Sequence, residues 1–345
     1  MPKIEKIRKY NIGYGSALKD LLLSTNGQYV GVSFEKDKKE YVQINDKIYG
    51  PYDWVYVHIF SNDGLKYGWV FKKDSKYYIQ INDKTYGPYD WADIPEFSND
   101  SSKYGWWFVK DNKYYVQIND RTYGPYNWVY VPIFSNDSSK YGWRFKKDFE
   151  YYIQINDKVY GPYEDSGSPR FSNDTSKYGW WFKKDNKYYV QINDRTYGPY
   201  NWAPDPIFSD DSSKYGWWFV KDDKNYIQIN DKIYGPYDTF HGPIIFSNDS
   251  SKYGWRFMNI KDKKLKEYIQ INDKTYGPYD WVSFPKFSND SSKYGWGLGK
   301  DNKYYIQINN KIYGPYDKAT FTFTKDNKAY IAYISGNELV IEEVE

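Results

Sequence analysis

Residues that could carry out catalysis or bind a metal ion are scarce in this chain of 345 residues. It contains no cysteine and two histidines, His58 and His241, which stand in unrelated sequence contexts. The absence of cysteine removes thiol nucleophiles, thiolate metal ligands and disulfides. Two unrelated histidines offer little basis for a zinc site or a histidine-dependent catalytic site. We therefore predict that the protein is not an enzyme and holds neither a metal ion nor a cofactor.

Aromatic side chains, in contrast, are abundant. They make up 22% of the chain, with 15 tryptophans, 43 tyrosines and 19 phenylalanines. Each such side chain buries about 150–250 Å² when it packs in a core, and tryptophan and tyrosine also anchor ligands at binding surfaces. Because these residues recur at fixed spacing, repeated structural elements must position them.

A unit of 37 residues is repeated along almost the whole chain. Its landmark is the glycine of a Tyr-Gly-Pro-Tyr motif, and one interval, from Gly235 to Gly277, is 42 residues long instead. A period of this length indicates a solenoid, a propeller or an array. The landmark glycines are Gly50, Gly87, Gly124, Gly161, Gly198, Gly235, Gly277 and Gly314.

Each unit contains four short runs with the composition of β-strands. In one copy they span residues 131–135, 141–146, 151–156 and 158–163. β-Branched and aromatic residues fill the runs, and Asn, Asp, Gly and Ser separate them. The Asn-Asp pair between the third and fourth runs suits a tight hairpin, because both residue types tolerate left-handed backbone conformations. We therefore predict one four-stranded antiparallel sheet per repeat.

The second run alternates between constant and variable positions. Tyr141, Trp143 and Phe145 recur in nearly every copy, which indicates that their face packs in the core. Gln154 of the third run also recurs; it either faces a ligand or, in our interpretation, satisfies buried backbone groups. The variable position between the constant aromatics is Val70, Trp107, Arg144, Trp181, Arg256 or Gly297.

The two ends of the chain are incomplete copies that complement each other. Residues 9–14 match a fourth run, whereas residues 320–324, 328–335 and 338–343 match the first three runs. An open solenoid needs capping units at both ends, while a closed ring removes two exposed strand edges. We therefore predict an all-β fold with one domain, residues 1–345, forming a single closed β-propeller of nine four-stranded blades. In this arrangement residues 1–16 and 318–345 together form the closing blade; if they do not, eight blades remain.

Two motifs resemble a known family. The Phe-Ser-Asn-Asp-Ser-Ser-Lys-Tyr turn of residues 134–141 and the Asn-Asp-Lys-x-Tyr-Gly-Pro-Tyr-Asp end of residues 82–90 are similar to those of bacterial WD-repeat-like propellers related to the TolB propeller domain. Asn136 and Ser138 depart from that family, which usually has proline and glycine there. The resemblance covers nearly the whole chain and implies a β-propeller that serves as a binding platform.

One segment of the unit varies between otherwise similar copies. It lies between the Gly-Pro-Tyr end and the next Phe-Ser, and we expect it to connect the outermost strand of one blade to the innermost strand of the next, ringing one mouth of a central channel. A proline stands near the start of that innermost strand, whose free edge tolerates a missing N–H. The copies span residues 54–59, 91–96, 128–133, 165–170, 202–207, 239–245 and 281–286.

These variable segments are our candidate binding surface. Relaxed constraint on exposed loops is the alternative explanation for their variation. The candidate ligand-binding residues are Trp54, Tyr56, His58, Trp91, Asp93, Glu96, Trp128, Tyr130, Arg170, Trp202, Asp205, His241, Trp281, Phe284 and Lys286.

Two classes of function fit these features, and a third, an enzyme, ranks last because no constellation of nucleophile, base and orienting residue stands out. We favour a non-catalytic binding or scaffold protein for a protein, peptide or other ligand, and the alternative is a lectin-like propeller that binds glycans through its repeated aromatic residues. Charges of both signs are interspersed and the net charge is +3, which argues against a nucleic-acid surface. The sequence shows no signal peptide and no membrane-spanning stretch, so we expect a cytoplasmic monomer.

Overall fold

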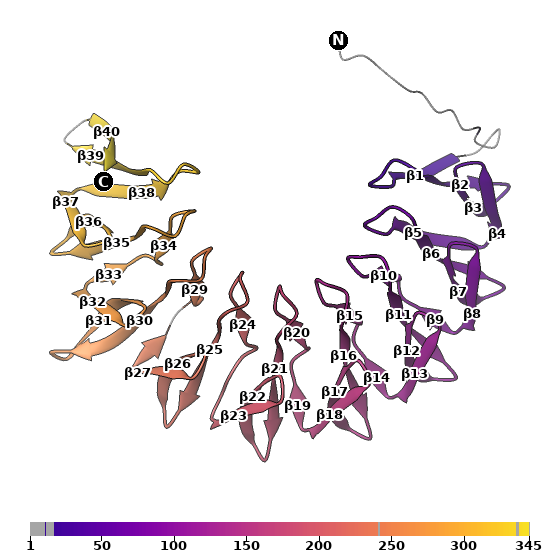
Figure 1. Cartoon of the computed structure of the whole chain (residues 1–345), viewed down its shortest axis with the longest axis horizontal. Helices are drawn as coiled ribbons and strands as arrows, with labels where there is room; N and C mark the ends of the chain where they lie inside the picture. Colours follow the sequence, from indigo (N-terminus) through magenta and orange to yellow (C-terminus); the bar gives the residue numbers. More distant parts are fainter. Residues whose placement is uncertain (1–10, 12–16, 241, 336–337, 345) are drawn as a thin grey trace, which may run out of the picture. The chain divides into compact units, whose positions relative to one another are not determined.

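The computed structural model describes residue 11 and residues 17–240, 242–335 and 338–344, with all side chains in those ranges except those of residues 57, 58 and 335 (Figure 1). All regular secondary structure in this described part is β-strand, with no helix. The strands form nine antiparallel sheets, in which neighbouring strands follow the order of the chain. These sheets have the form of propeller blades, so the predicted all-β fold and the count of nine are confirmed, and we number the blades one to nine in chain order.

The chain divides into two compact units, Met1–Pro169 and Arg170–Glu345. The first unit contains blades one to four and a short strand that follows them. Blade one consists of β1 (Ala17–Leu23), β2 (Val30–Lys36), β3 (Lys39–Ile44) and β4 (Lys47–Tyr52); blade two of β5 (Trp54–Phe60), β6 (Tyr67–Lys73), β7 (Lys76–Ile81) and β8 (Lys84–Tyr89); blade three of β9 (Trp91–Ala92), β10 (Glu96–Phe97), β11 (Tyr104–Lys110), β12 (Lys113–Ile118) and β13 (Arg121–Tyr126); and blade four of β14 (Trp128–Val129), β15 (Ile133–Phe134), β16 (Tyr141–Lys147), β17 (Glu150–Ile155) and β18 (Lys158–Tyr163), with β19 (Asp165–Ser166) after it.

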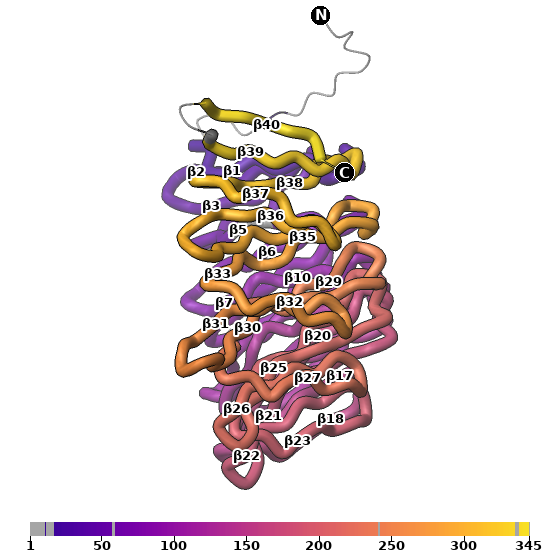
Figure 2. The backbone as a smooth tube through the Cα atoms, turned by 90° about the vertical axis from the view of Figure 1, so that its left-hand side faces the viewer, coloured from indigo at the N-terminus to yellow at the C-terminus, as the bar shows by residue number. Residues whose placement is uncertain are grey.

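The second unit contains the strands of blades five to nine. Its last sheet has three strands in the described part, drawn in yellow in Figure 2. Blade five consists of β20 (Arg170–Phe171), β21 (Tyr178–Lys184), β22 (Lys187–Ile192) and β23 (Arg195–Tyr200); blade six of β24 (Ile207–Phe208), β25 (Tyr215–Lys221), β26 (Lys224–Ile229) and β27 (Lys232–Tyr237); blade seven of β28 (Thr239–Phe240), β29 (Ile245–Phe246), β30 (Tyr253–Lys261), β31 (Lys264–Ile271) and β32 (Lys274–Tyr279); blade eight of β33 (Trp281–Val282), β34 (Lys286–Phe287), β35 (Tyr294–Lys300), β36 (Lys303–Ile308) and β37 (Lys311–Tyr316); and blade nine of β38 (Lys318–Phe323), β39 (Ala329–Ser335) and β40 (Glu338–Val344).

The hairpin turns form where the sequence predicts them. Asp111 and Asn112 join β11 to β12 with φ angles of 51° and 58°, the left-handed conformation that a two-residue hairpin requires. Asn119, in the next turn, also has a positive φ of 50°. Its side-chain oxygen accepts a hydrogen bond from the backbone N–H of Tyr104 at 3.0 Å. The asparagine therefore both permits the turn and ties its hairpin to the start of the second strand.

The first run differs from its prediction. In blade four it is two pieces, β14 and β15, which both pair with β16, so the innermost strand begins at Trp128 and not near residue 131. Pro132 lies in the gap between the pieces, because it has no N–H to donate to the ladder. In blade two His58 stands in the place of this proline, and β5 runs unbroken from Trp54 to Phe60. The variable segments therefore begin the innermost strands themselves, whereas the sequence predicted that those strands start near the proline.

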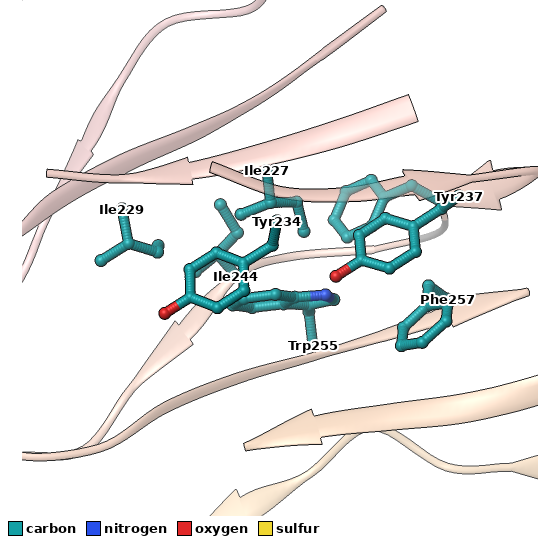
Figure 3. Packing of buried hydrophobic residues seen from close by; sticks show 8 residues of the cluster. Ile227, Ile229, Tyr234, Tyr237, Ile244, Trp255 and Phe257 are labelled. Carbon is teal, nitrogen blue, oxygen red and sulfur yellow. The ribbon is translucent and has the colours of Figure 1, made fainter. Parts of the chain in front are cut away.

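A constant tryptophan of the second strand lies in six of the buried clusters between neighbouring blades, whereas the cluster of blades eight and nine contains none. Trp255 of blade seven is 0% exposed, and its indole meets the ring of Tyr234 of blade six edge-on, with ring centroids 5.0 Å apart. Ile227 and Ile229 of blade six pack in the same cluster (Figure 3). The interpretation of the constant aromatics as core is confirmed by the burial of Trp69, Trp106, Trp143, Trp180, Trp217, Trp255 and Trp296.

The repeated glutamine satisfies buried polar groups, as the sequence indicates. In blade three Gln117 is buried, its amide nitrogen donates to the backbone oxygen of Asn119 at 2.8 Å, and its amide oxygen accepts from the hydroxyl of Thr122 at 2.6 Å. Because both ends of the amide have partners within the same blade, this glutamine serves the fold and is not available to a ligand.

The predicted end pieces are partly described. The three C-terminal runs are present as β38, β39 and β40. The predicted N-terminal strand, residues 9–14, lies outside the described residues except for Asn11. Within the described residues, no helix is long and apolar enough to cross a membrane.

Candidate ligand-binding surface

The variable segment of a blade meets the variable position of its own second strand. In blade three Trp91 stacks on Trp107, with ring centroids 4.4 Å apart and an angle of 22° between the rings. In blade six Trp202 lies over Trp218 at 4.3 Å. We call the side chains at these two sets of positions the variable face, because they share one side of each sheet while the constant tryptophans occupy the other.

Blade two presents a cleft on this face with a volume of about 210 Å³. Trp54 and Trp91 are each 38% exposed and Tyr56 is 46% exposed, so water or a ligand reaches their rings. The ring centroid of Tyr77 lies 6.3 Å from those of Trp54 and Trp91. The complete lining is Trp54, Tyr56, Val70, Tyr77, Trp91, Ala92, Asp93 and Ile94.

Blade four carries an arginine at the position that Val70 occupies in blade two. The guanidinium carbon of Arg144 lies 5.1 Å from the ring centroid of Tyr130 and 4.1 Å from that of Tyr151. Its Nη2 is 2.5 Å from Oδ1 of Asp165. The side chain of Arg144 is 12% exposed, so this cation is largely removed from water and is stabilised by two aromatic faces and one carboxylate.

The acidic residues of blade three lie beside the blade-two cleft. Asp93 is part of the cleft lining. Glu96 is exposed as a residue, but burial of its carboxyl group among neighbouring atoms, together with the charge of Asp93, raises the pKa of Glu96. Two carboxylates therefore give this edge of the cleft a negative potential when both are ionised.

In the second unit the predicted residues take part in separate local contacts. Nε of Arg170 lies 3.4 Å from Oδ2 of Asp205. The guanidinium of Arg256 lies 5.0 Å from the ring centroid of Phe284. The amino group of Lys286 lies over Phe321 at 5.2 Å. These pairs do not form one continuous site, so the evidence for a ligand cleft is strongest around Trp54 and Trp91.

The remaining predicted residues are two histidines whose side chains the structure does not describe and two tryptophans that pack against tyrosines. His241 lies outside the described residues, and the side chain of His58 is not described. Trp128 packs edge-on against Tyr130, with centroids 3.9 Å apart, and Trp281 against Tyr304 at 5.2 Å. The described part contains no group of three or more His, Cys, Asp or Glu residues that could hold a metal ion.

Sequence reasoning did not assign Val70, Tyr77, Trp107 and Arg144 to the site. The variable position of the second strand could have indicated that this strand belongs to the site, because its residue changes from copy to copy as the variable segments do. Register explains the connection: Trp91 pairs with Val109 and Ala92 with Phe108, so the segment lies directly alongside the variable position of β11. Variation at both places therefore marks one surface.

The constant residues also line grooves between adjacent blades. One groove, of about 510 Å³, runs along the fourth strand of blade six and includes Tyr237, Phe257 and Gln270. A groove of about 380 Å³ between blades three and four includes the equivalent residues Tyr126, Phe145 and Gln154. A ligand that binds the constant residues of each repeat would contact these grooves, because the constant tryptophans are buried.

Comparisons with known proteins assign no family to the chain. No protein-family model matches the sequence, and no curated protein matches it. Among solved structures, the chain is similar to the Dos1 propeller (16% identity, 70% of this chain and 75% of that chain, TM-score 0.35). It is also similar to the β-propeller domain of the Trilobed protease from Pyrococcus furiosus (11% identity, 89% of this chain and 98% of that chain, TM-score 0.32). A third similar structure is TolB from Acinetobacter baumannii (12% identity, 86% of this chain and 80% of that chain, TM-score 0.29). Likeness at this level assigns no ligand and no activity.

Proposed function

We propose that the protein is a non-catalytic binding or scaffold protein of the WD-repeat-like propeller kind, and that its ligand contacts the variable face. The supporting observation is the contrast between two sets of tryptophans. Trp69 and Trp106 are fully buried and belong to the core, whereas Trp54, Trp91 and Trp202 are each 37–38% exposed. Tryptophans of this second kind have ring surface available to a ligand, and such residues dominate binding energy at protein surfaces.

The variation between blades supports an asymmetric ligand. The same structural position carries valine in blade two, tryptophan in blade three and arginine in blade four, as Val70, Trp107 and Arg144. Val70 is 2% exposed and the side chain of Arg144 is 12% exposed, so each change alters the residue that lies beneath the exposed aromatic rings of its blade. A protein or peptide can use such differences, whereas a ring of identical small ligands cannot.

The test is a binding screen with matched variants. Arrays of peptides and of glycans are probed with the wild-type protein and with the variant Trp54→Ala/Trp91→Ala/Trp202→Ala. We expect the variant to keep its melting temperature within a few degrees and to lose at least tenfold in affinity for any captured ligand, which is about 1.4 kcal/mol. A control variant, Val159→Ala, changes the groove between blades three and four and should bind as the wild type does. Unchanged affinity of the triple variant for every ligand would refute the proposal.

A lectin-like function is the second candidate, and one observation favours it. The grooves of blades three to four and six to seven are built from equivalent constant residues, among them Tyr152 and Tyr268. Repeated grooves suit a glycan with repeated units. In that case the screen would yield a glycan whose binding is insensitive to the triple tryptophan variant and is weakened by Val159→Ala.

Cytoplasmic location and a monomeric state complete the proposal. Cell fractionation checks the first and light scattering of the purified chain checks the second.

A further inference from the structure

Blades two and four present the same constellation at positions that are 74 residues apart. Trp54 corresponds to Trp128, Tyr56 to Tyr130, and Tyr77 to Tyr151. In each blade one tyrosine comes from the innermost strand or its extension and the other from the third strand. The aromatic walls are therefore shared, and the two blades differ in what lies between the walls.

Blade four shows what the walls can hold. The guanidinium of Arg144 lies 5.1 Å from the centroid of Tyr130 and 4.1 Å from that of Tyr151. Asp165 accepts a hydrogen bond from Nη2 of this arginine at 2.5 Å. The aromatic pair thus encloses a cation that the protein itself supplies, and a carboxylate accepts a hydrogen bond from one nitrogen of that cation.

Blade two lacks both the internal cation and its carboxylate partner. Val70 stands where blade four has Arg144, and Trp91, at the start of blade three, corresponds to Asp165, which follows blade four. Val70 and Trp91 both line the cleft of about 210 Å³, a volume well above the ~10–15 Å³ that one water molecule needs by the same measure. Replacing a carboxylate by an indole removes a hydrogen-bond acceptor and adds an aromatic face.

The indole of Trp91 in place of the carboxylate of Asp165 favours some kinds of cation over others. A lysine ammonium is strongly hydrated and would lose its water without enough acceptors in the cleft. A quaternary ammonium group has no N–H to satisfy, its alkyl groups pack against indole and phenol rings, and its charge is attracted to the ring faces. Asp93, which is part of the cleft lining, adds long-range attraction for a cation.

A lysine near the cleft does not block it. The amino group of Lys72 lies 5.3 Å from the ring centroid of Tyr77. In blade four the equivalent Lys146 lies 4.9 Å from the centroid of Tyr151, together with Arg144. Because that tyrosine accommodates both cations at once, Lys72 leaves room for a second cation beside Tyr77.

We propose that the blade-two cleft lined by Trp54, Tyr56, Tyr77, Trp91 and Asp93 binds a quaternary ammonium group, in the place that Arg144 fills in blade four. The inference rests on the proposed function, since it assigns a ligand chemistry to one part of the variable face. Both free choline-like molecules and a trimethylated lysine side chain present this group.

The direct test is calorimetric titration of the full chain with choline and with its neutral isostere 3,3-dimethyl-1-butanol. We expect choline to bind at least tenfold more tightly, because the two differ in charge and hardly in shape. A peptide containing trimethyllysine, and the same peptide with unmodified lysine, form a second arm. Preference for the trimethylated peptide over choline would identify a peptide as the source, and the reverse would identify a small molecule. Equal affinity for choline and the isostere would overturn the proposal.

Reciprocal substitutions supply the matched controls. Val70→Arg/Trp91→Asp rebuilds the blade-four arrangement in blade two and should lower choline affinity at least tenfold. Arg144→Val/Asp165→Trp makes the opposite change, and the blade-four walls should then bind choline as a second site. Should either pair unfold, Tyr56→Ala, which removes an exposed ring, must still weaken choline binding at least threefold.

The experiments distinguish failure of the quaternary ammonium inference from failure of the proposed function. If choline binding is absent while the triple tryptophan variant still abolishes binding of a ligand from the arrays, the quaternary ammonium inference is wrong and the proposed function stands. If choline binds and is insensitive to Tyr56→Ala and to Val70→Arg/Trp91→Asp, the site lies elsewhere and the inference is equally wrong.

Discussion

The phenol oxygens of Tyr86 in blade two and Tyr104 in blade three lie 2.7 Å apart. Tyr86 also donates a hydrogen bond to Oδ1 of Asp120 at 2.8 Å. Burial, followed by these two hydrogen bonds, raises the pKa of Tyr86. The contact joins the fourth strand of one blade to the second strand of the next, and equivalent tyrosine pairs recur along the chain, as Tyr49 with Tyr67 and Tyr276 with Tyr294.

Removing this hydroxyl should weaken the junction between the two blades. We expect Tyr86→Phe to lower the free energy of unfolding by about 1–2 kcal/mol, because it removes two hydrogen bonds and leaves Tyr104 and Asp120 short of a partner. The matched control is Tyr123→Phe in the next blade, where the hydroxyl contacts Tyr141 at 2.7 Å. Urea unfolding should rank Tyr86→Phe as the more damaging change, and equal effects would show that the contact to Asp120 contributes nothing.

The two classes of tryptophan should differ strongly in their effect on stability. Trp217 is 1% exposed and Trp202, in the same blade, is 37% exposed. Trp217→Ala creates a cavity in the core and should cost about 3–5 kcal/mol or prevent folding. Trp202→Ala should cost about 1 kcal/mol, since it loses one stacking contact with Trp218. Thermal melts of both variants check the difference, and similar losses would contradict the division into core and surface tryptophans.

Most of the blade could be predicted because its signals are local. Alternation of constant and variable residues in 141–146 identified the buried face, and turn residues such as Asp111 and Asn112 identified the hairpins through their tolerance of positive φ. The split of the innermost strand could not be predicted. Pairing of Trp128 with Lys146 and of Ile133 with Gly142 depends on where Pro132 falls along a partner strand, and the sequence alone does not specify that register.

The candidate site was predicted in part, for a similar reason. Its exposed residues Trp54, Tyr56 and Trp91 come from the variable segments that the sequence singles out. Val70 and Tyr77 face them from two other strands, and only the strand order brings all five together. The pairing of Arg144 with Asp165 could not be predicted either, since the two residues lie in different strands and only the fold brings this largely buried arginine to its carboxylate.

Acid should destabilise the serine-rich turns that precede each second strand. Hydrogen bonds from the hydroxyl and backbone N–H of Ser176, and from the hydroxyl of Ser172, lower the pKa of Asp174 to about 2. An unfolded aspartate titrates near 3.9, so the folded carboxylate contributes stability above that pH, and the contribution is lost as the pH falls toward 2. We expect Asp174→Asn to flatten the decline in melting temperature between pH 4 and pH 2. Asp185→Asn, which removes an exposed carboxylate from the hairpin of the same blade, is the control and should leave the slope as it is in the wild type.

Alkali should destabilise the protein through its buried tyrosines. Burial raises the pKa of Tyr89, Tyr126 and Tyr200 to about 12 in each case. In the unfolded chain they titrate near 10, so between these values the folded state binds more protons and its stability falls as the pH rises. Each unit of pKa difference corresponds to about 1.4 kcal/mol, so the free energy of unfolding should decline as the pH rises above 10. Urea unfolding at pH 9, 10 and 11 measures the decline, which Tyr126→Phe should make shallower; a stability that does not change from pH 9 to 11 would contradict the argument.

The last sheet bears on how the ends of the chain are arranged. In the described part β40 pairs with β39 alone, and Leu339 and Ile341 on β40 are 73% and 68% exposed. At the other end, Nε2 of Gln43 donates a hydrogen bond to the backbone oxygen of Asn11 at 2.9 Å. By the 37-residue spacing Asn11 corresponds to a fourth-strand position such as Ile233, which lines a groove together with the glutamine of the following blade. Asn11 therefore contacts blade one as a fourth strand would contact the next blade.

We predict that residues 9–14 supply the fourth strand of the last sheet and close the propeller as a ring. Such a strand would cover the edge of β40, since unpaired edges with exposed apolar residues promote association between chains. Deleting residues 1–15 should therefore lower the melting temperature by at least several degrees and produce oligomers in light scattering. Deleting residues 1–8 is the matched control, because it shortens the same terminus and leaves the proposed strand in place, and this variant should remain monomeric with the melting temperature of the full chain. If the longer deletion behaves like the shorter one, residues 9–14 do not pair with β40 and the ring is not closed in this way.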